Sequence, residues 1–360
     1  MLFEAVVIIY MKNFNINYLL PGLTRKRVSL PTFGKVNMLE DNFGRRFYYL
    51  RLSITDVCNF KCTYCLPDGY QCDQPRDFMS LAEIKRLTAA FAGLGTEKIR
   101  ITGGEPALRK DLPDIIHACK QTNGIKKVAI TSNGFKLPEH LPQWLDAGID
   151  AINISIDSLD PRKFHAITGH NKLDTILKGI DMALADGRPT VKVNTVLMRE
   201  YSGYDIESYL DWLKDTPVTL RFIELMQTGD NQEFFDAQHV QGSRIKQNLI
   251  LDGWLPVLQD KTAGPAQEFY HPDYQGRIGL IMPYSKDFCN TCNRLRVSSS
   301  GKLHLCLFSE SGLSLREQLQ CDDIAPLQAQ ILSLLGDKKA THFLHEKLTG
   351  GTKHLAMLGG

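Results

Sequence analysis

The first chemically suggestive feature of the sequence is a group of three closely spaced cysteines. Cys58, Cys62 and Cys65 lie within eight residues, with three and then two residues between them. Three thiolates at this spacing can surround one metal centre, and soft sulfur ligands select iron–sulfur clusters, zinc or copper(I). A structural zinc ion would need a fourth protein ligand, and no His lies in this segment. We therefore expect a cubane iron–sulfur cluster with one iron left open to a small molecule.

A second group comprises Cys289, Cys292 and Cys306, with two and then thirteen residues between them. His304 is a candidate fourth ligand here, so a cluster with an open iron and a zinc site are both compatible with the sequence. The total of nine cysteines is odd, and we recognise no export signal in the sequence. Such cysteine usage predicts a reducing compartment, the cytoplasm, in which thiols serve as metal ligands or nucleophiles.

Composition excludes several classes of partner. The chain has 360 residues with 42 Lys and Arg against 40 Asp and Glu, and its net charge of +2 provides no global field for nucleic acid or an acidic membrane. The sequence contains no run of about 20 apolar residues of the kind that crosses a bilayer. Residues 1–40 are predicted to be a disordered N-terminal extension or an artefact of the choice of start site, and no functional residue is assigned to them.

The elements that must position the cysteines alternate between strands and helices. Ser80 followed by Glu83 predicts a capping box at the start of a helix over 81–94. Six strands in one direction with helices between them imply a parallel sheet, here a partial (βα)6 TIM-like barrel over residues 41–269. Residues 270–360 are predicted to form a C-terminal domain with an antiparallel hairpin around the second cysteine group. The predicted strands cover residues 48–55, 98–102, 127–132, 151–157, 190–198 and 219–226.

One face of the predicted strands is polar. Arg51, Arg100, Asn153 and Lys192 alternate with apolar residues, although a strand covered by helices should be apolar on both faces. Buried cations without enough nearby carboxylates indicate an anionic ligand, most economically a phosphate or triphosphate, and a web of internal salt bridges is the alternative. For the sixth strand, the sequence does not decide which of the two alternating sets of residues points inward. At the carboxyl ends of the strands, where barrel ligands bind, the second strand is followed by Gly103-Gly104-Glu105-Pro106 and the third ends in Ser132-Asn133-Gly134.

Together these motifs resemble the radical S-adenosylmethionine superfamily and, within it, the GTP 3′,8-cyclase family of molybdenum cofactor biosynthesis. The similarity covers about residues 41–360 and includes both cysteine spacings and the terminal Gly359-Gly360. It also rests on the segments at residues 51–56 (Arg-Leu-Ser-Ile-Thr-Asp), 100–106, 221–226 (Arg-Phe-Ile-Glu-Leu-Met) and 289–296. The alternatives are another two-cluster member of the superfamily, such as a peptide-maturing enzyme, and a non-catalytic iron–sulfur or zinc protein.

The resemblance implies a role for each matching residue. Cys58, Cys62 and Cys65 would hold the 4Fe–4S cluster that binds and reduces S-adenosylmethionine. The auxiliary 4Fe–4S cluster would be held by Cys289, Cys292 and Cys306. The matches to the S-adenosylmethionine contacts are Tyr64, Gly104, Ser155 and Met226. The matches to the GTP contacts are Arg51, Arg100, Thr131, Lys192, Arg294 and Arg296.

The reaction and partners implied by the resemblance follow from these roles. Cleavage of S-adenosylmethionine would give methionine and a 5′-deoxyadenosyl radical, which takes hydrogen from ribose C3′ of GTP before that carbon attacks guanine C8. The tail of Gly359 and Gly360 would reach into the active site and assist the reaction. The family also implies a reducing electron donor, a homodimer, and transfer of the product to the cyclic pyranopterin monophosphate synthase.

Overall fold

The computed structural model describes residues 38–71, 77–202, 206–229 and 231–351, together with residues 356 and 358. The extension predicted over residues 1–40 lies outside the described residues except for its last three. Among those three, Leu39 is 2% exposed and packs in the hydrophobic core. Of the helices in the described ranges, none is long and apolar enough to cross a membrane.

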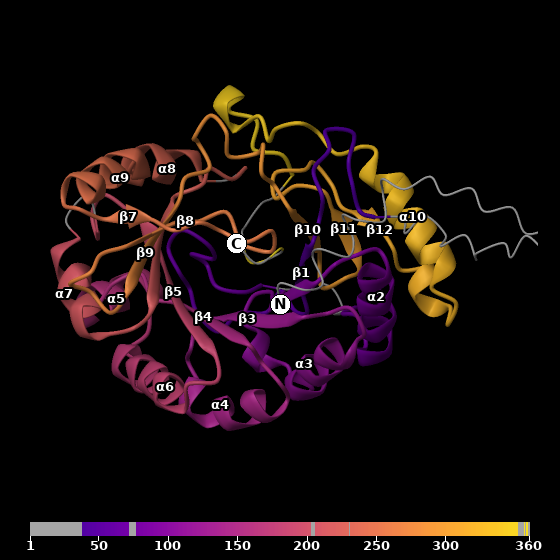
Figure 1. Ribbon diagram of the computed structural model, residues 1–360, viewed down its shortest axis with the longest axis horizontal. Coiled ribbons are helices and arrows are strands. Elements are labelled where there is room, and N and C mark those ends of the chain that lie inside the picture. Colours follow the sequence, from indigo (N-terminus) through magenta and orange to yellow (C-terminus); the bar gives the residue numbers. More distant parts are fainter. Residues whose placement is uncertain are drawn as a thin grey trace, which may run out of the picture. The chain divides into compact units, whose positions relative to one another are not determined.

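The described residues form a sheet of twelve strands in the order β12-β11-β10-β1-β2-β3-β4-β5-β6-β9-β8-β7 (Figure 1). The strands that form the centre of the sheet are β1 (Tyr49–Ser53), β2 (Lys98–Thr102), β3 (Lys127–Ser132), β4 (Ala151–Ser155), β5 (Thr190–Leu197) and β6 (Thr219–Glu224). The flanking strands are β7 (Leu255–Pro256), β8 (Gln267–Tyr270), β9 (Arg277–Ile281), β10 (Arg294–Val297), β11 (Lys302–His304) and β12 (Leu313–Ser314).

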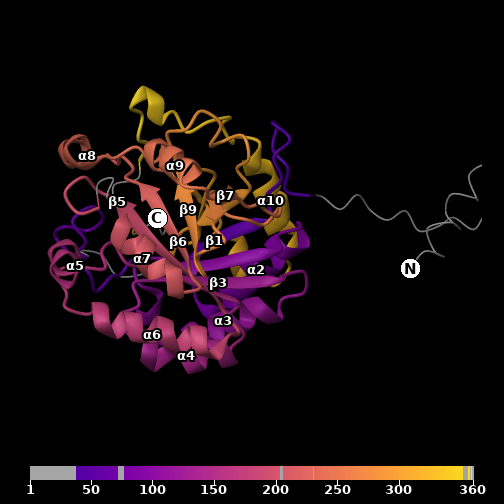
Figure 2. The ribbon, with the colours of Figure 1, turned by 60° about the vertical axis from the view of Figure 1, so that its left-hand side comes forward.

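Helices connect the central strands and lie outside the curved sheet, as the two ribbon views show (Figures 1 and 2). The first five helices are α2 (Leu81–Gly93), α3 (Leu112–Gln121), α4 (Leu137–Asp146), α5 (Pro161–Thr168) and α6 (Leu173–Asp186). The later ones are α7 (Glu207–Asp215), α8 (Gln232–Gln238), α9 (Gly242–Leu251) and α10 (Ala325–Leu335). Short 3-10 turns are η1 (Pro106–Leu108), η2 (Gln318–Gln320) and η3 (Leu344–Glu346).

The central strands confirm the predicted partial (βα)6 barrel. Strands β1 to β6 pair in chain order and in parallel, and the sheet does not close because its two ends are β12 and β7. Two strands from the C-terminal region extend the parallel part: β10 pairs with β1 and β9 pairs with β6. The predicted hairpin is also present, since β10 and β11 are antiparallel. The domain boundary near residue 270 stays a prediction; it falls at the end of β8, which pairs with β9.

Apolar and polar residues alternate along β1 and β2, and this alternation explains why the sheet packs against the helices with one face only. Leu50, Leu52, Ile99 and Ile101 are fully buried on the face toward the helices. The helix that follows β1 begins as predicted: the Ser80 backbone N–H donates to Glu83 Oε2 at 2.8 Å, and the Glu83 N–H donates to Ser80 Oγ at 3.3 Å. The polar residues are thereby left on the opposite, inner face of the sheet.

Two strand-end loops pack on each other at the carboxyl edge of the sheet. Gly104 N–H donates to the Thr55 carbonyl at 2.9 Å and Glu105 N–H to the Val57 carbonyl at 2.7 Å. A Cβ atom at Gly104 would lie 2.2 Å from the Val57 carbonyl oxygen, so this close approach of two backbones requires glycine. The loop that carries the first cysteine group is therefore held directly against the loop after β2.

Candidate active site

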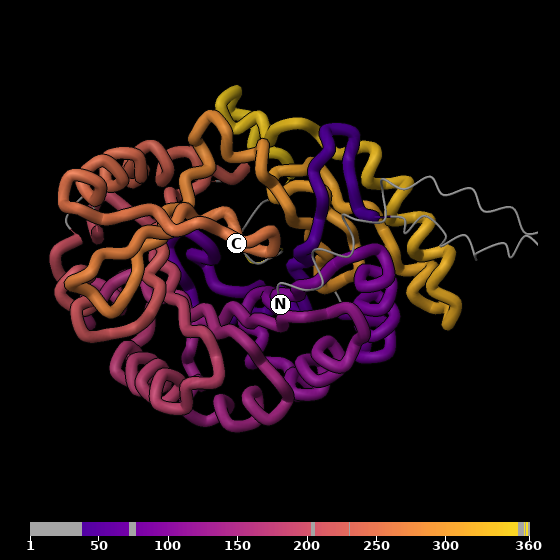
Figure 3. Tube along the Cα trace, in the orientation of Figure 1, coloured from indigo at the N-terminus to yellow at the C-terminus, as the bar shows by residue number. Residues whose placement is uncertain are grey.

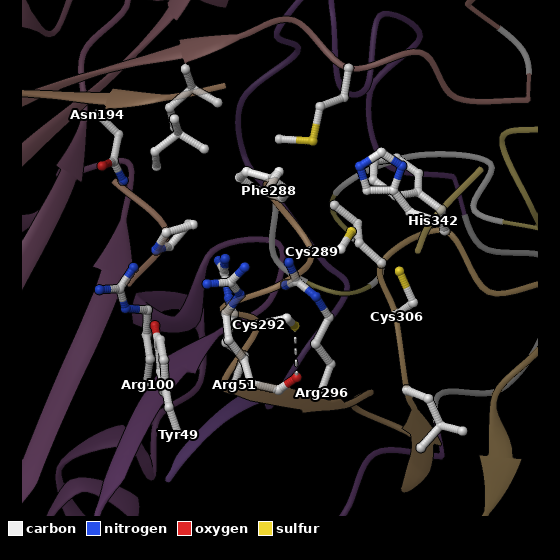
Figure 4. Close-up of a pocket in the computed structure, with 18 of the residues that line it drawn as sticks. Tyr49, Arg51, Arg100, Asn194, Phe288, Cys289, Cys292, Arg296, Cys306 and His342 are labelled. Carbon is white, nitrogen blue, oxygen red and sulfur yellow. Dashed lines mark hydrogen bonds between the residues drawn. The ribbon is translucent and has the colours of Figure 1, made fainter. Parts of the chain in front are cut away.

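Six inward side chains from three neighbouring strands form a block that we call the cation grid. Register places Tyr49 opposite Lys98 on one side and Arg294 on the other, and Arg51 opposite Arg100 and Arg296 in the next row. Five of the six side chains are cationic and none is acidic. Figure 4 shows several of them pointing into a common pocket.

Burial makes this grid electrostatically unfavourable unless an anion is present. Arg51 and Arg296 are each 9% exposed and Arg100 is 7% exposed. Burial and the neighbouring Arg296 lower the pKa of the Arg51 guanidinium, and burial with Arg294 lowers the pKa of Arg296 to about 10. For Tyr49, burial alone would raise the pKa, but the nearby cations outweigh it and lower the value to about 8. The positive face predicted from strand parity is therefore present, and it is suited to an anionic ligand.

The predicted alternative, a web of internal salt bridges, describes the next part of the same face. Lys192 Nζ lies 2.8 Å from Glu268 Oε1, and Arg221 Nη2 lies 3.3 Å from the same oxygen. Arg221 Nη1 also donates to Asn153 Oδ1 at 3.2 Å. Lys192 is not among the residues that line the pocket of the cation grid, whereas Arg221 is. The salt-bridge alternative therefore applies to Lys192 and Arg221, and an anionic ligand stays the prediction for the cation grid.

Arg221 is a pocket residue that strand parity did not identify. Its strand carries polar residues on both faces, so the sequence left the inward direction open. The structure pairs Arg221 with Asn194 and with Gly279 in register. A Cβ atom at Gly279 would lie 3.0 Å from Arg221 Cγ, so the glycine leaves room for the arginine. Three other residues that line this pocket also could not be identified from the sequence, because no motif contains them: Tyr49, Phe288 and His342.

The second cysteine group lines the pocket of the cation grid. Cys289, Cys292 and Cys306 all face it, and Figure 4 shows their sulfur atoms beside Arg296 and His342. Burial alone would raise the pKa of Cys292, but Arg294, Lys338 and Arg45 outweigh it and lower the value. Burial raises the pKa of Cys306. His304, the candidate zinc ligand, lies on β11 opposite Arg296 and does not line this pocket.

The first cysteine group lies in an adjoining pocket. Cys58, Cys62 and Cys65 line it, together with four residues that the resemblance assigns to S-adenosylmethionine: Tyr64, Gly104, Ser155 and Met226. Thr131, assigned to GTP, also lines this pocket rather than that of the cation grid. The two pockets share Asn194, Ile223 and Met226. A ligand in either pocket therefore faces the other across the same three side chains.

Hydrogen bonds at the strand ends orient the first pocket. Tyr64 Oη donates to Asp157 Oδ2 at 3.0 Å, and the Val196 N–H donates to Asp157 Oδ1 at 2.9 Å. Burial raises the pKa of Asp157 to about 6. Glu105, 1% exposed, accepts hydrogen bonds from Ser132 Oγ at 2.8 Å and from the Asn133 N–H at 2.6 Å. These contacts connect the loops after β2, β3 and β4 around the cysteine loop.

The donor sets fit clusters better than single ions. In the described part of the chain, no three His, Cys, Asp or Glu side chains converge closely enough to hold one metal ion. In a cubane each cysteine binds a different iron, so its ligands surround a space instead of meeting at a point. Burial raises the pKa of Cys58 to about 11 and that of Cys62 well above its ordinary value. Binding of iron by these thiols must therefore displace protons.

The end of the chain approaches both pockets. Arg296 Nη1 donates to the Leu358 carbonyl at 3.4 Å, and Ala356 lines the pocket of the first cysteine group. Leu358 is 2% exposed and packs with Phe308, Met226 and Cys306 in a small apolar cluster. Gly359 and Gly360, assigned a catalytic role by the resemblance, lie outside the described residues.

Comparisons with known proteins agree with this geometry. The Radical SAM superfamily model matches residues 52–213, and the Molybdenum Cofactor Synthesis C model matches residues 218–344. The chain is 56% identical to a GTP 3′,8-cyclase of Shewanella denitrificans over 335 residues, 92% of this chain and 99% of the relative. It is 56% identical to a GTP 3′,8-cyclase of Vibrio vulnificus over 324 residues, 89% of this chain and 97% of that one.

Solved structures support the fold alone. The crystal structure of Streptococcus suis SuiB bound to S-adenosylmethionine has a TM-score of 0.57 at 13% identity, covering 80% of this chain and 68% of SuiB. The same protein bound to precursor peptide SuiA has a TM-score of 0.58 at 13% identity, covering 92% of this chain and 78% of the other. With this fold, both family models and 56% identity along nearly the whole chain, the protein belongs to the GTP 3′,8-cyclase family of the radical S-adenosylmethionine superfamily.

Proposed function

We propose that this protein is a GTP 3′,8-cyclase, which converts GTP to (8S)-3′,8-cyclo-7,8-dihydroguanosine 5′-triphosphate with release of 5′-deoxyadenosine and methionine. This reaction is the first step of molybdenum cofactor biosynthesis. The observation that carries the proposal is the cation grid: four of its five cations line the pocket of the second cysteine group, which adjoins the pocket of the first. A nucleoside triphosphate supplies the negative charge that these side chains require.

In the first pocket, Cys58, Cys62 and Cys65 would hold a 4Fe–4S cluster. When bound, this cluster supplies the electron that cleaves S-adenosylmethionine into methionine and the 5′-deoxyadenosyl radical. Gly104 would let the backbone approach the cofactor, and Asp157 holds Tyr64 beside it. Ser155 and Met226 would complete the S-adenosylmethionine contacts, with Met226 at the junction of the two pockets.

In the second pocket, the chain's own side chains would fix the substrate at both ends. Arg51, Arg100, Arg294 and Arg296 would bind the triphosphate, with Lys192 and Thr131 at the margins of the site. Cys289, Cys292 and Cys306 would hold a second 4Fe–4S cluster that supplies an open iron for the guanine end of GTP. Fixing a substrate at two points restricts a reactive intermediate to one outcome.

The C-terminal tail would complete the site. Leu358 is buried and its carbonyl accepts a hydrogen bond from Arg296, which places the chain beside the proposed triphosphate site two residues before its end. Gly359 and Gly360 have no side chains and would enter a narrow space beside the substrate. Their proposed role is to assist the reaction after hydrogen has been taken from the ribose.

The remaining proposals concern the setting of the reaction. The enzyme would act in the cytoplasm, where thiol ligands stay reduced, and would take electrons from a reducing donor. It would form a homodimer and pass its product to the cyclic pyranopterin monophosphate synthase. Neither nucleic acid nor a membrane is proposed as a partner, in keeping with the net charge of +2.

Nucleotide dependence of turnover tests the proposed function. Reconstituted protein is incubated anaerobically with S-adenosylmethionine, dithionite and either GTP, ATP or guanosine, and 5′-deoxyadenosine and cyclised nucleotide are measured by mass spectrometry. We expect a cyclised product from GTP alone, and none from the Cys58→Ala variant, which lacks a proposed cluster ligand. Equal turnover of ATP or guanosine in place of GTP would refute the assignment.

A further inference from the structure

Tyr49 occupies the one position of the cation grid that is not a cation. It lies on β1 between Lys98 of β2 and Arg294 of β10, and the next row of the grid contains Arg51, Arg100 and Arg296. Its side chain lines the pocket of the cation grid. Figure 4 shows the ring beside Arg100, with the hydroxyl oxygen at the end that faces the pocket.

Among the residues that the structure describes, the buried Tyr49 hydroxyl finds no acceptor for its proton. The residue is 1% exposed, and within the described part of the chain its Oη has no hydrogen-bond partner. A buried hydroxyl in a native protein normally has a partner, because leaving it unsatisfied is costly. An unsatisfied hydroxyl that lines a ligand pocket therefore points to a partner on the ligand.

The neighbours of Tyr49 determine what chemistry that partner must have. Lys98 Nζ lies 4.7 Å from the centre of the ring and Arg100 Cζ lies 5.5 Å from it, so both cations contact the ring face. Lysine and arginine side chains carry donors and no acceptors. The two cations that contact the Tyr49 ring therefore cannot accept the phenol proton, whereas the oxygens of a polyphosphate are acceptors that the same cations attract.

We infer that the Tyr49 hydroxyl donates a hydrogen bond to a polyphosphate oxygen of the nucleoside triphosphate substrate, which makes Tyr49 a substrate-binding residue of the cation grid. The inference rests on the proposed function and deepens it, because it assigns a neutral donor to a site otherwise composed of charges. The aromatic ring contacts both Lys98 and Arg100, and the hydroxyl adds a directional contact that point charges lack.

The Tyr49→Phe variant isolates the hydroxyl because it keeps the ring and its contacts with both cations. Binding of GTP and of guanosine to the reconstituted full-length protein is measured by anaerobic calorimetry, and iron content and circular dichroism confirm that the variant is folded and loaded. A lost hydrogen bond to a charged acceptor predicts GTP binding weaker by roughly ten- to hundredfold, with guanosine binding unchanged. Tyr48→Phe is the matched control, since Tyr48 lines neither pocket and contacts Lys261 instead.

Each other outcome overturns the inference in a distinguishable way. Wild-type GTP affinity in Tyr49→Phe, together with a large loss in Arg100→Ala, would remove Tyr49 from the site and leave the proposed function intact. An equal loss for GTP and guanosine would show a structural effect instead of a polyphosphate contact. Failure of the wild-type protein to bind GTP would overturn the proposed function and this inference together.

Discussion

Two lysines, Lys98 of the cation grid and the half-buried Lys192 beside it, show how burial shapes the chemistry of single residues. Lys98 is 8% exposed, and burial, only partly offset by nearby Tyr49, lowers its pKa to about 8. Burial and Arg221 lower the pKa of Lys192 to about 8, although Glu268 opposes the shift. Both side chains therefore titrate close to physiological pH when no anion is bound. A triphosphate would favour their charged forms and raise both pKa values.

The first prediction is that GTP affinity falls as pH rises above about 8. Below this pH both lysines are already protonated, so both attract the triphosphate fully. Above it they are neutral in the free protein and must each bind a proton when GTP binds, which weakens GTP binding. Tyr49, with a pKa of about 8, would act in the same direction because its ionised form repels the ligand. Anaerobic calorimetry from about pH 7, where the phosphate charge is nearly constant, measures the effect.

The matched comparison for this prediction replaces Lys98 and Lys192 by Arg, which stays protonated throughout the range. We expect the double variant to keep more of its affinity at high pH than the wild-type protein. The charged groups that face these lysines include Arg100, Arg221 and Glu268, and the substitutions leave all three in place. A flat profile in the wild-type protein would contradict the account of the lysines.

A second prediction at the residue scale concerns Gly104. In Gly104→Ala the new Cβ would lie 2.2 Å from the Val57 carbonyl oxygen and 2.6 Å from that of Asp56, just before Cys58. We expect the two loops to separate, with a loss of stability of about 1–3 kcal/mol and weaker S-adenosylmethionine binding. Denaturant unfolding and calorimetry measure these effects. Gly229→Ala is the control, because nothing lies within 4 Å of a Cβ there, and equal behaviour of the two variants would refute the prediction.

Among the structural elements, the hairpin closed by the antiparallel bridge between Glu40 and Arg46 holds the loop of the second cysteine group. Arg45 Nη1 donates to the Cys289 carbonyl at 3.1 Å and to the Ala340 carbonyl at 2.8 Å, and Arg45 Nη2 donates to the Lys339 carbonyl at 2.7 Å. The buried Asp41 fixes the guanidinium through Nε at 2.7 Å. Figure 3 shows this hairpin beside the segment that follows α10. One arginine thereby joins three segments that are far apart in sequence.

The third prediction is that Arg45→Ala loosens the second cysteine group selectively. The variant leaves Asp41 buried without its partner and frees three carbonyls, which should cost about 3 kcal/mol. Iron content should fall toward that of one cluster while S-adenosylmethionine cleavage persists. The neighbouring Arg46→Ala is the control, since its ion pair with Glu40 is exposed and should have little effect. Full iron content in Arg45→Ala would contradict this role.

The sequence predicted these elements well where one face of a strand was consistently apolar. Ile99 and Ile101 alternate with Arg100, so the direction of the arginine followed from parity alone. Arg221 was missed because Arg221 and Glu224 belong to opposite faces of the same strand, so the sequence offered a polar residue on each face. The strand also ends at Glu224. The pairing of β10 with β1 could not be predicted either, because it joins residues more than 240 positions apart. Such contacts depend on tertiary packing and leave no local pattern.

In the whole molecule, the open edges of the barrel bring the two cysteine groups together. Because β10 adds to β1, the loop before it carries Cys289 and Cys292 to the mouth of the sheet. The apolar cluster of Leu307, Phe308, Leu344 and Leu358 then packs against Cys65 and Cys306. The consequence is two adjoining pockets, each lined by one cysteine group, and no single segment of the chain forms either of them alone.

The fourth prediction concerns the iron content of the whole protein. Anaerobically reconstituted wild-type protein should contain about eight irons per chain, four in each proposed cluster. Cys58→Ala should lose about half and abolish S-adenosylmethionine cleavage, whereas Cys306→Ala should lose about half but retain uncoupled cleavage. Cys321→Ala, at an exposed position, should keep all the iron. About one zinc per chain without iron would instead support a structural metal site.

The most direct test follows hydrogen from the substrate. The reconstituted protein is incubated anaerobically with S-adenosylmethionine, dithionite and GTP deuterated at ribose C3′, and the 5′-deoxyadenosine is analysed by mass spectrometry. The two adjoining pockets predict that deuterium appears in 5′-deoxyadenosine, because the ribose would lie where they meet. Unlabelled 5′-deoxyadenosine formed during turnover of the labelled GTP would contradict the proposed reaction at its central step.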